Sequence, residues 1–147
     1  MKVAVIGDGG WGTALALVLA RHGHAPRVWG PDEKYLAEVR QTRRNRKFLP
    51  GVELPEPLAW TADPAAALAG AEAVVMVVPS RYVRATLERF AADYRAAGSP
   101  PVVSATKGFD EATRERMTEI LSELWGVRTP AALSGPSIAP ETARGVP

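Results

Sequence analysis

The sequence predicts an α/β fold in which helices cover both faces of a doubly wound, mostly parallel sheet. Two observations carry this prediction. Residues 3–20 run from a short apolar segment through a glycine cluster into an Ala/Leu-rich segment, which is the pattern of strand, tight turn and helix. Further along, short β-branched runs alternate with helical patterns, and this alternation is typical of parallel sheets with right-handed crossovers.

The first turn carries the spacing Gly7-x-Gly9-x-x-Gly12 between the expected strand and helix. In that context the spacing is the dinucleotide-binding fingerprint of Rossmann-type domains. Gly7 allows a sharp turn, Gly9 lets a pyrophosphate approach the backbone, and Gly12 lets the helix pack closely on the strand. Because a helix N-terminus presents unpaired N–H groups and a positive dipole end, this segment predicts a phosphate-binding loop.

The second predicted strand is Ala25–Trp29, and the adenosine ribose lies near the end of this strand in such folds. An acid there favours NAD and a basic residue favours NADP. Asp32 follows Pro31, and two interpretations stay open for it: contact with the ribose, or the N-terminal cap of a helix expected over 32–42. The sequence therefore leaves the choice between NAD and NADP open.

A dense basic run, Arg43 to Lys47, follows this helix. It fits either a phosphate or nucleic-acid patch, or a solvated and mobile loop. We expect the mobile loop and no nucleic-acid partner, because no aromatic interleaving and no second basic segment accompany the run.

The middle of the chain continues the alternation. A short strand is expected over 58–61, and Asp63 predicts the cap of a short helix. Residues 73–78 form a continuous apolar run, as in strands buried on both faces of a parallel sheet, and Pro79 falls at the carboxyl end where ligands bind. A helix to about residue 97 follows. Its apolar stripe, which predicts packing against the sheet, consists of Val83, Leu87, Phe90 and Tyr94.

A strand over 101–105 leads directly into Lys107, so this lysine also falls at the carboxyl end of a strand. Site residues gather at this edge of a parallel sheet, which favours a functional role for Lys107 over plain surface charge. An amphipathic helix is expected over 113–125. A last short strand over 131–133 leads into a third glycine-containing loop.

Composition bounds the class of protein. A chain of 147 residues with 46% hydrophobic and 23% charged residues is typical of one globular domain, and the net charge of +2 suits an anionic ligand. The absence of cysteine excludes thiolate metal sites, and the isolated His22 and His24 do not argue for a metal. The apolar stretch Ala14 to Ala20 is too short to span a bilayer, so we expect a cytoplasmic protein without a membrane span.

Taken together, the loops resemble the amino-terminal half of the NAD(P)-dependent glycerol-3-phosphate dehydrogenases. The matching pieces occur in the family's order across essentially the whole chain. They are GDGGWGTALA at 7–16, Val28-Trp29-Gly30, Asn45 with Phe48-Leu49-Pro50-Gly51, Val78-Pro79-Ser80, Ala105-Thr106-Lys107-Gly108 and SGPSIAPE at 134–141. Other dinucleotide-binding enzymes share the first piece but not the last two together.

The resemblance implies reversible hydride transfer between NAD or NADP and the pair dihydroxyacetone phosphate and sn-glycerol 3-phosphate, a step toward glycerophospholipids. It assigns Lys107 to both cofactor and substrate, and Gly135 and Ser137 to the substrate. Pro31 stands where some family members carry a polar or basic residue near the ribose. With the glycine fingerprint and the strand ends, the expected cofactor contacts are Gly7, Gly9, Gly10, Trp11, Gly12, Pro31, Pro79, Lys107 and Ala139.

In this family a helical domain follows, and it carries the acid/base lysine and most of the substrate-phosphate site. We expect residues 1–147 to form one NAD(P)-binding domain without that helical domain, and to turn over little or no substrate alone. The face that docks on a helical domain should be apolar, so a homodimer through this face is a further expectation. Two alternatives stay open: a stand-alone dinucleotide-binding module, and the cofactor domain of a 3-hydroxy acid dehydrogenase.

Overall fold

Six parallel strands form one sheet in the computed structural model, which describes residues 1–56 and 58–146. The strand order is β3-β2-β1-β4-β5-β6, so the chain starts in the middle of the sheet and winds outward in both directions. The strands are β1 (Lys2–Ile6), β2 (Ala25–Trp29), β3 (Ala59–Thr61), β4 (Ala73–Met76), β5 (Val102–Ser104) and β6 (Ala131–Ala132). This topology confirms the predicted doubly wound α/β fold, with every described strand pair parallel.

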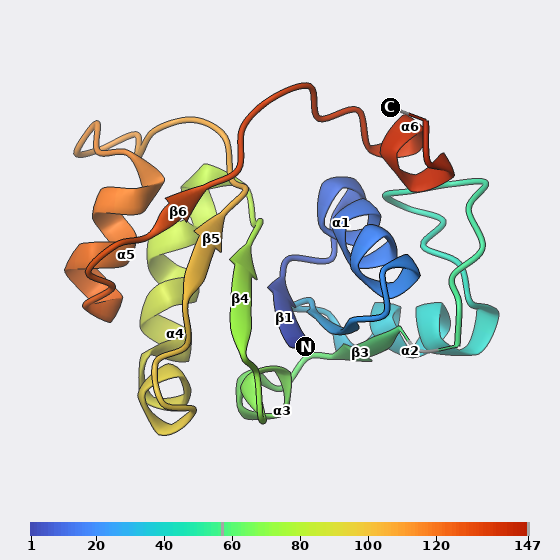
Figure 1. The fold of residues 1–147 in the computed structure, drawn as a ribbon, viewed down its shortest axis with the longest axis horizontal. Coiled ribbons are helices and arrows are strands. Elements are labelled where there is room, and N and C mark those ends of the chain that lie inside the picture. The colour runs from blue at the N-terminus through green and yellow to red at the C-terminus, as the bar shows by residue number, and fades with distance from the viewer. Residues whose placement is uncertain (57, 147) are drawn as a thin grey trace.

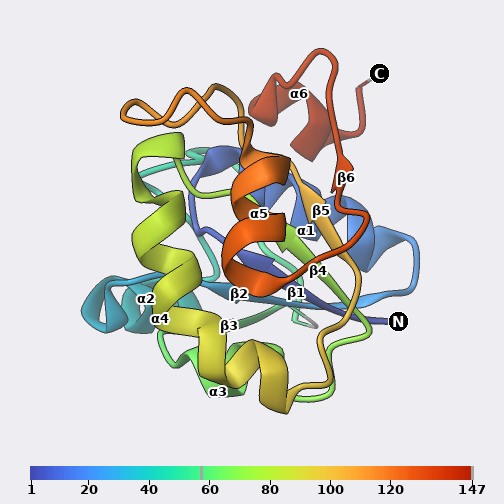
Figure 2. The ribbon, with the colours of Figure 1, turned by 90° about the vertical axis from the view of Figure 1, so that its left-hand side faces the viewer.

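Helices cover both faces of this sheet (Figure 1). They are α1 (Gly10–Arg21), α2 (Glu33–Thr42), α3 (Pro64–Leu68), α4 (Val83–Ala96), α5 (Met117–Trp125) and α6 (Ala139–Arg144), with a 3-10 turn η1 at Ser80–Tyr82. One core joins the sheet to α3, α4 and α5, and a second joins it to α1, α2 and α6. Figure 2 shows α4 and α5 side by side in front of the strands. In the described part of the chain, no helix has the length and apolar character needed to cross a membrane.

Aromatic rings fill the core on the α4 side. Phe90 meets Trp29 edge-on with ring centroids 4.9 Å apart, and Tyr94 stacks on Trp125 at 4.0 Å. The indole N–H of Trp125 donates to the backbone oxygen of Leu87 at 2.7 Å, so this buried polar group is satisfied. All four residues of the predicted α4 stripe are buried, which confirms their role in the core.

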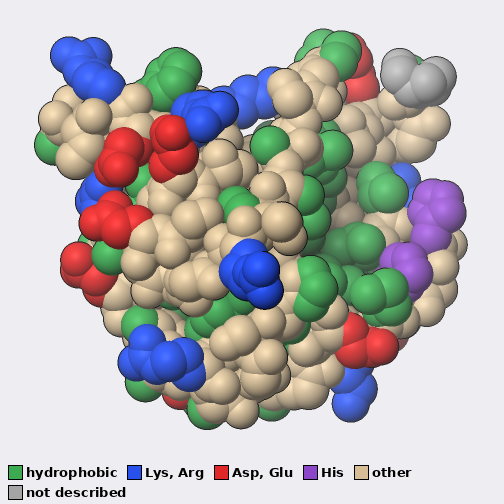
Figure 3. Space-filling model, turned by 60° about the vertical axis from the view of Figure 1, so that its left-hand side comes forward, with side chains coloured by type: hydrophobic (Ala, Val, Ile, Leu, Met, Phe, Trp, Pro, Cys, Tyr) green, Lys and Arg blue, Asp and Glu red, His purple; other side chains and the backbone are tan. Residues whose placement is uncertain are grey.

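The α1 side of the sheet is covered less completely. Helix α1 packs on β1 and β2, while Val75, Val77 and Val103 on or beside β4 and β5 keep part of their side chains exposed. In Figure 3, hydrophobic side chains line a hollow next to the two histidines that follow α1. This side therefore carries an apolar hollow that the described residues leave open.

The carboxyl ends of the strands lie level across the sheet, as the crossovers predict. Ile6 of β1 is in register with Trp29 of β2 and with Met76 of β4, and Met76 is in register with Ser104 of β5. The loops that leave β1, β4 and β5 therefore start side by side at one edge. These are the loops in which the sequence places most of the candidate site.

The helix expected over 113–125 begins only at Met117. The Asp110 carboxylate accepts hydrogen bonds from the backbone N–H and the hydroxyl of Thr113, at 2.9 and 3.0 Å. These bonds, the first of them above all, lower the pKa of Asp110. The segment before Met117 is thus a separate turn built around one carboxylate, which the periodicity of the sequence does not reveal.

Candidate functional site

A cleft of about 950 Å³ opens at the carboxyl ends of β1, β4 and β5. Its walls come from the glycine loop after β1, from the segment 77–89 around η1 and the start of α4, and from 105–107 after β5. This is the edge where open α/β sheets bind their ligands. Its volume lies in the upper range of sites for small molecules and cofactors.

The glycine loop forms one end of the cleft, and its glycines differ in what surrounds them. A Cβ on Gly7, whose φ is +134°, would lie 2.9 Å from the backbone of Val77. A Cβ on Gly12 would lie 2.1 Å from the backbone oxygen of Gly7. A Cβ on Gly9 would meet nothing within 4 Å. Gly7 and Gly12 therefore serve close packing, whereas the space at Gly9 is open to a ligand, as the fingerprint predicts.

The N-terminus of α1 faces this open space. Gly9 is its N-cap, with φ −65° and ψ 176°, and no side chain caps the helix there. The first-turn N–H groups have no intrahelical acceptors, and the helix dipole adds positive character to them. An uncapped helix start beside a vacant glycine position fits the pyrophosphate of a dinucleotide.

Asn45 braces the glycine loop from behind. It is fully buried, and its amide nitrogen donates to the backbone oxygen of Asp8 and to the hydroxyl of Thr13, both at 2.8 Å. Its amide oxygen accepts from the hydroxyl of Tyr35 at 2.7 Å and from the N–H of Phe48 at 3.2 Å. One side chain thus ties the loop to α1, to α2 and to the segment that follows.

The segment from Arg43 to Lys47 is a loop, as predicted, and its charged residues Arg44, Arg46 and Lys47 are exposed, but Asn45 is buried. Asn45 ties this segment to the glycine loop through Asp8, and the next residue, Phe48, packs on that loop, because a Cβ on Gly10 would lie 2.5 Å from its backbone oxygen. Lys47 lines the cleft, with its ammonium 4.8 Å from the ring centroid of Phe48. The charge pattern predicts the exposed side chains of this loop, but it does not predict the hydrogen bonds of buried Asn45.

Asp32 is an N-cap. Its carboxylate accepts from the backbone N–H of Tyr35 at 3.0 Å, at the start of α2, and Asp32 is not among the residues that line the cleft. Of the two interpretations of Asp32 left open by the sequence, the structure confirms the cap. Pro31, by contrast, does line the cleft.

Lys107 forms the opposite wall. The hydroxyl of the preceding Thr106 donates to the backbone oxygen of Val78 at 2.7 Å, which joins the loops that leave β4 and β5. The Lys107 ammonium donates to the backbone oxygen of Gly135 at 2.7 Å, and the Ser137 hydroxyl donates to the same oxygen at 3.0 Å. The three residues expected at the substrate therefore lie together, although 28 positions separate Lys107 from Gly135.

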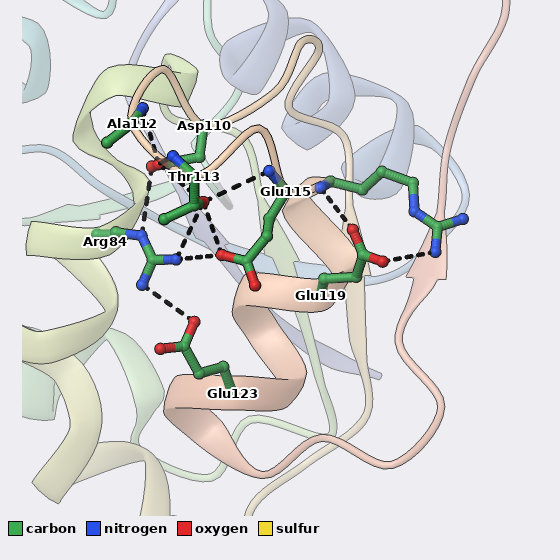
Figure 4. A network of polar contacts seen from close by, with 8 residues as sticks. Arg84, Asp110, Ala112, Thr113, Glu115, Glu119 and Glu123 are labelled. Atoms are coloured by element: carbon green, nitrogen blue, oxygen red, sulfur yellow. Dashed lines mark hydrogen bonds and ion pairs between the residues drawn. The ribbon is translucent and has the colours of Figure 1, made fainter.

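Arg84 of α4 fixes the loop that follows Lys107 (Figure 4). Its guanidinium lies 3.3 Å from the Asp110 carboxylate and 3.0 Å from that of Glu123, and it also pairs with Glu115. These three acids come from the turn after β5 and from α5. The network therefore anchors that turn to the α4 face of the domain, away from the cleft.

Most of the predicted site residues line this one cleft: Gly7, Gly9, Gly10, Trp11, Gly12, Pro31, Pro79, Lys107 and Ser137. Gly135 and Ala139 are not among the lining residues. Gly135 accepts a hydrogen bond from Lys107, and Ala139 lies beside the glycine loop, with its Cβ 3.7 Å from a Cβ built on Gly10. Further lining residues that the sequence did not point to are Asp8, Arg81, Tyr82, Thr86 and Arg89. Lys47, from the basic run, lines the cleft as well. Only Asp8 has a clear signal, an acidic residue inside a phosphate-binding glycine motif.

An open glycine position in front of a free helix start, at the first crossover of a parallel sheet, defines the Rossmann class of dinucleotide-binding domains. Comparison with known proteins narrows this class to a family. Residues 2–147 match the family described as the NAD-dependent glycerol-3-phosphate dehydrogenase N-terminus, and the chain belongs to that family.

Individual relatives agree with this assignment. The glycerol-3-phosphate dehydrogenase [NAD(P)+] of Xanthomonas oryzae pv. oryzae is 42% identical over 147 residues, covering 99% of this chain and 42% of that protein. The enzyme of the same name from Geobacillus kaustophilus is 42% identical over 144 residues, covering 95% of this chain and 41% of that protein. The chain thus spans less than half the length of these relatives.

A solved structure supports the same family. The crystal structure of glycerol-3-phosphate dehydrogenase from Coxiella burnetii superposes with a TM-score of 0.89 at 32% identity, covering 99% of this chain and 44% of that one. A UDP-glucose dehydrogenase from Pyrobaculum islandicum, at 18% identity and a TM-score of 0.65, shares the fold alone. The comparisons therefore favour the glycerol-3-phosphate dehydrogenase family over a neighbouring family of dehydrogenases.

Proposed function

We propose that the cleft binds NAD(H) or NADP(H). The pyrophosphate lies over Gly9 and the N-terminus of α1, the adenosine half extends toward the end of β2, and the nicotinamide half extends toward Pro79 and Lys107. The open space at Gly9 and the uncapped start of α1 support this orientation. So do Pro31 and Pro79, which line the same cleft and follow β2 and β4, the strands on either side of β1.

The proposed reaction is the interconversion of dihydroxyacetone phosphate and sn-glycerol 3-phosphate. The observation that carries it is the position of Lys107, which shares the cleft with the glycine loop and bonds to Gly135 beside Ser137. The Lys107 ammonium hydrogen-bonds the substrate oxygen and offsets negative charge that develops on it. Gly135 and Ser137 orient the substrate. The bound nicotinamide supplies or accepts the hydride.

We propose that this domain supplies one side of the substrate site and that a helical domain, with the acid/base lysine, supplies the other. On this basis residues 1–147 bind the cofactor and turn over little or no substrate by themselves. The exposed segment around Gly135 and Ser137 supports a site that needs a second wall. Robust reduction of dihydroxyacetone phosphate by the 147-residue chain would contradict this proposal.

The proposal extends to a homodimer of this domain in the cytoplasm, with small-molecule ligands and no nucleic-acid partner. The partly exposed side chains of Val75 and Val103, on β4 and β5, support the dimer. The packing of the Arg43 to Lys47 segment on the glycine loop supports a small-molecule role for its charges. Analytical ultracentrifugation over a wide concentration range tests the dimer, and a sharp monomer throughout would exclude it.

Tryptophan fluorescence titration with NADH and with NADPH tests cofactor binding, since Trp11 and Trp29 both line the cleft. The decisive variant is Gly9→Ala, whose φ and ψ suit alanine and whose Cβ enters empty space. We expect its thermal unfolding to match the wild type while both affinities fall about tenfold or more, because the methyl group displaces the pyrophosphate from its N–H donors.

Gly12→Ala is the control for Gly9→Ala: it makes the same substitution in the same loop, at a position without space for a Cβ. Its Cβ would overlap the backbone oxygen of Gly7, so it should lower the unfolding temperature as well as the affinity. Saturable wild-type binding that Gly9→Ala leaves intact would show that the dinucleotide lies elsewhere. No saturable binding of either nucleotide would overturn the proposed function itself.

A further inference from the structure

Asp8 occupies an unusual place inside the glycine loop. It stands between Gly7 and Gly9, lines the cleft, and is half-buried. Its carboxylate lies against Gly30, because a Cβ on Gly30 would be 2.3 Å from Asp8 Oδ2. Because Gly30 has no side chain, the Asp8 side chain occupies the space beside it. The carboxylate thus extends from the loop after β1 to the end of β2.

The end of β2 is where a dinucleotide fold meets the adenosine ribose, and an acid near this point accepts from the ribose hydroxyls. The residues at that point do not supply the acid: Pro31 has no polar side chain, and Asp32 caps α2 outside the cleft. Among the cleft-lining residues that the structure describes, Asp8 carries the only carboxylate. The carboxylate that usually stands at the end of β2, near the adenosine ribose, is therefore supplied here by Asp8 of the glycine loop.

The Asp8 carboxylate has no side-chain partner among residues 1–56 and 58–146. The hydrogen bonds made to Asp8 by Thr13 and Asn45 end on its backbone oxygen, and no ion pair within residues 1–56 and 58–146 includes its side chain. Burial, the largest cause, raises the pKa of Asp8. A hydrogen bond from its own backbone N–H and the charge of Lys47 lower this pKa, and the charge of Asp32 raises it. A carboxylate held in this state gains from hydroxyl donors that a ligand brings.

We propose that the Asp8 carboxylate accepts hydrogen bonds from the adenosine ribose of NAD(H) and repels the 2′-phosphate of NADP(H), so that Asp8 makes this domain selective for NAD(H). The inference rests on the proposed dinucleotide site and deepens it. NAD(H) and NADP(H) differ only at this ribose, so a charge beside it acts on one cofactor and not equally on the other.

Cations in the same cleft act in the opposite direction. Lys47, Arg81 and Arg89 all line it, and each is able to attract a phosphate. All three lie over aromatic rings: Lys47 at 4.8 Å from the centroid of Phe48, Arg81 at 4.8 Å from that of Tyr82 and Arg89 at 5.2 Å from that of Trp29. We expect the Asp8 carboxylate, which has no ion pair among the described residues, to outweigh these ring-packed cations at the 2′ position.

The test compares Asp8→Asn with Asp32→Asn. Both changes remove one negative charge without changing the shape of the side chain, and asparagine caps a helix as well as aspartate does. Dissociation constants for NADH and NADPH are measured on each variant by fluorescence titration, with thermal unfolding as the check on folding. We expect the wild type to prefer NADH by about tenfold or more, and Asp8→Asn to reduce that preference by about tenfold. Asp32→Asn should leave the preference unchanged within about twofold.

The outcomes separate this inference from the function on which it rests. Equal wild-type affinities, a preference for NADPH, or a preference that Asp8→Asn leaves intact would overturn the role of Asp8 while the dinucleotide site stands. If only Asp32→Asn lost the preference for NADH over NADPH, Asp32 rather than Asp8 would select the cofactor. Competition by 5′-AMP and 2′,5′-ADP repeats the comparison on the adenosine half alone, and Asp8→Ala should narrow the difference between these two probes. Absence of binding by every nucleotide would instead remove the proposed function.

Discussion

The two walls of the cleft are built in different ways. In the glycine-loop wall, backbone groups touch each other directly at Gly7 and Gly12, and Asn45 is 0% exposed with every polar atom of its side chain hydrogen-bonded. In the Lys107 wall, the bonds from Lys107 and Ser137 to Gly135 are exposed, and both residues of β6 are exposed as well. One wall is held by burial and the other by a few hydrogen bonds in contact with water.

This difference separates binding from chemistry. Exposed hydrogen bonds compete with water and add little net stability, whereas buried ones are expensive to lose. The glycine-loop wall is therefore preorganised for a cofactor before any ligand arrives. The Lys107 wall opens locally at small free-energy cost, so its working geometry depends on what covers it. The domain is therefore better preorganised for cofactor binding, at the glycine-loop wall, than for the reaction at the Lys107 wall.

The largest expected effect falls on the weaker wall. In a chain that also carries the helical substrate domain, Lys107→Ala should lower kcat about a hundredfold to a thousandfold, because the substrate oxygen loses a charged donor. Thermal unfolding of the variant should stay close to that of the wild type, since the Lys107 side chain is exposed. Steady-state kinetics with dihydroxyacetone phosphate measure the effect. Lys34→Ala, on the exposed face of α2, is the matched control.

Unchanged kcat in Lys107→Ala would remove this lysine from the proposed reaction. A large fall in the unfolding temperature would instead mean that the Lys107 wall is held more firmly than its exposure indicates, and the contrast between the walls would be lost.

A smaller effect should appear in stability and fall on the opposite wall. Asn45→Ala should lower the free energy of unfolding by about 2–4 kcal/mol, because the Asp8 carbonyl, the Thr13 hydroxyl and the Tyr35 hydroxyl each lose a buried partner. Ser137→Ala removes an exposed hydroxyl and should change that free energy by no more than about 0.5 kcal/mol. Urea unfolding followed by tryptophan fluorescence compares the two. Equal losses in both variants would contradict the difference between the walls.

The fold was predictable because its signals are local. The glycine spacing 7–12, the apolar run at 73–78 and the cap at Asp63 each act within a few residues, and each lies in the expected element. The start of α5 was missed, because the Asp110 turn and its pairing with Arg84 interrupt the helical pattern before Met117. Periodicity records which face of a helix is buried, but it does not record a carboxylate that caps a turn from outside the helix.

The site was predictable only in part, for a related reason. Strand ends and glycines gave the position of the cleft and of Lys107, since topology brings them to one edge. Asn45 bonds to Asp8 across 37 positions, and Asp8 meets Gly30 from a different loop. Such contacts depend on the packed structure. The sequence therefore did not show that Asn45, within the basic run, is buried, or that Asp8, within the glycine motif, reaches the end of β2.

The smallest expected effect is the pH dependence of stability caused by Asp8, which lies on the rigid wall and has no ion pair among the described residues. Because burial raises its pKa above the ordinary value of 3.8, the folded state binds this proton more tightly than the unfolded state does. The ionised carboxylate therefore destabilises the fold at neutral pH, and stability is regained as the pH falls through the folded-state pKa toward 3.8.

Asp8→Asn should be more stable than the wild type at pH 7, by no more than about 1 kcal/mol. The difference should shrink on acidification and vanish below about pH 3.8, as urea titrations at several pH values would measure. An Asp8→Asn variant that is less stable than the wild type at pH 7 would mean that the carboxylate already has a stabilising partner. It would then not be available to accept hydrogen bonds from the ribose hydroxyls.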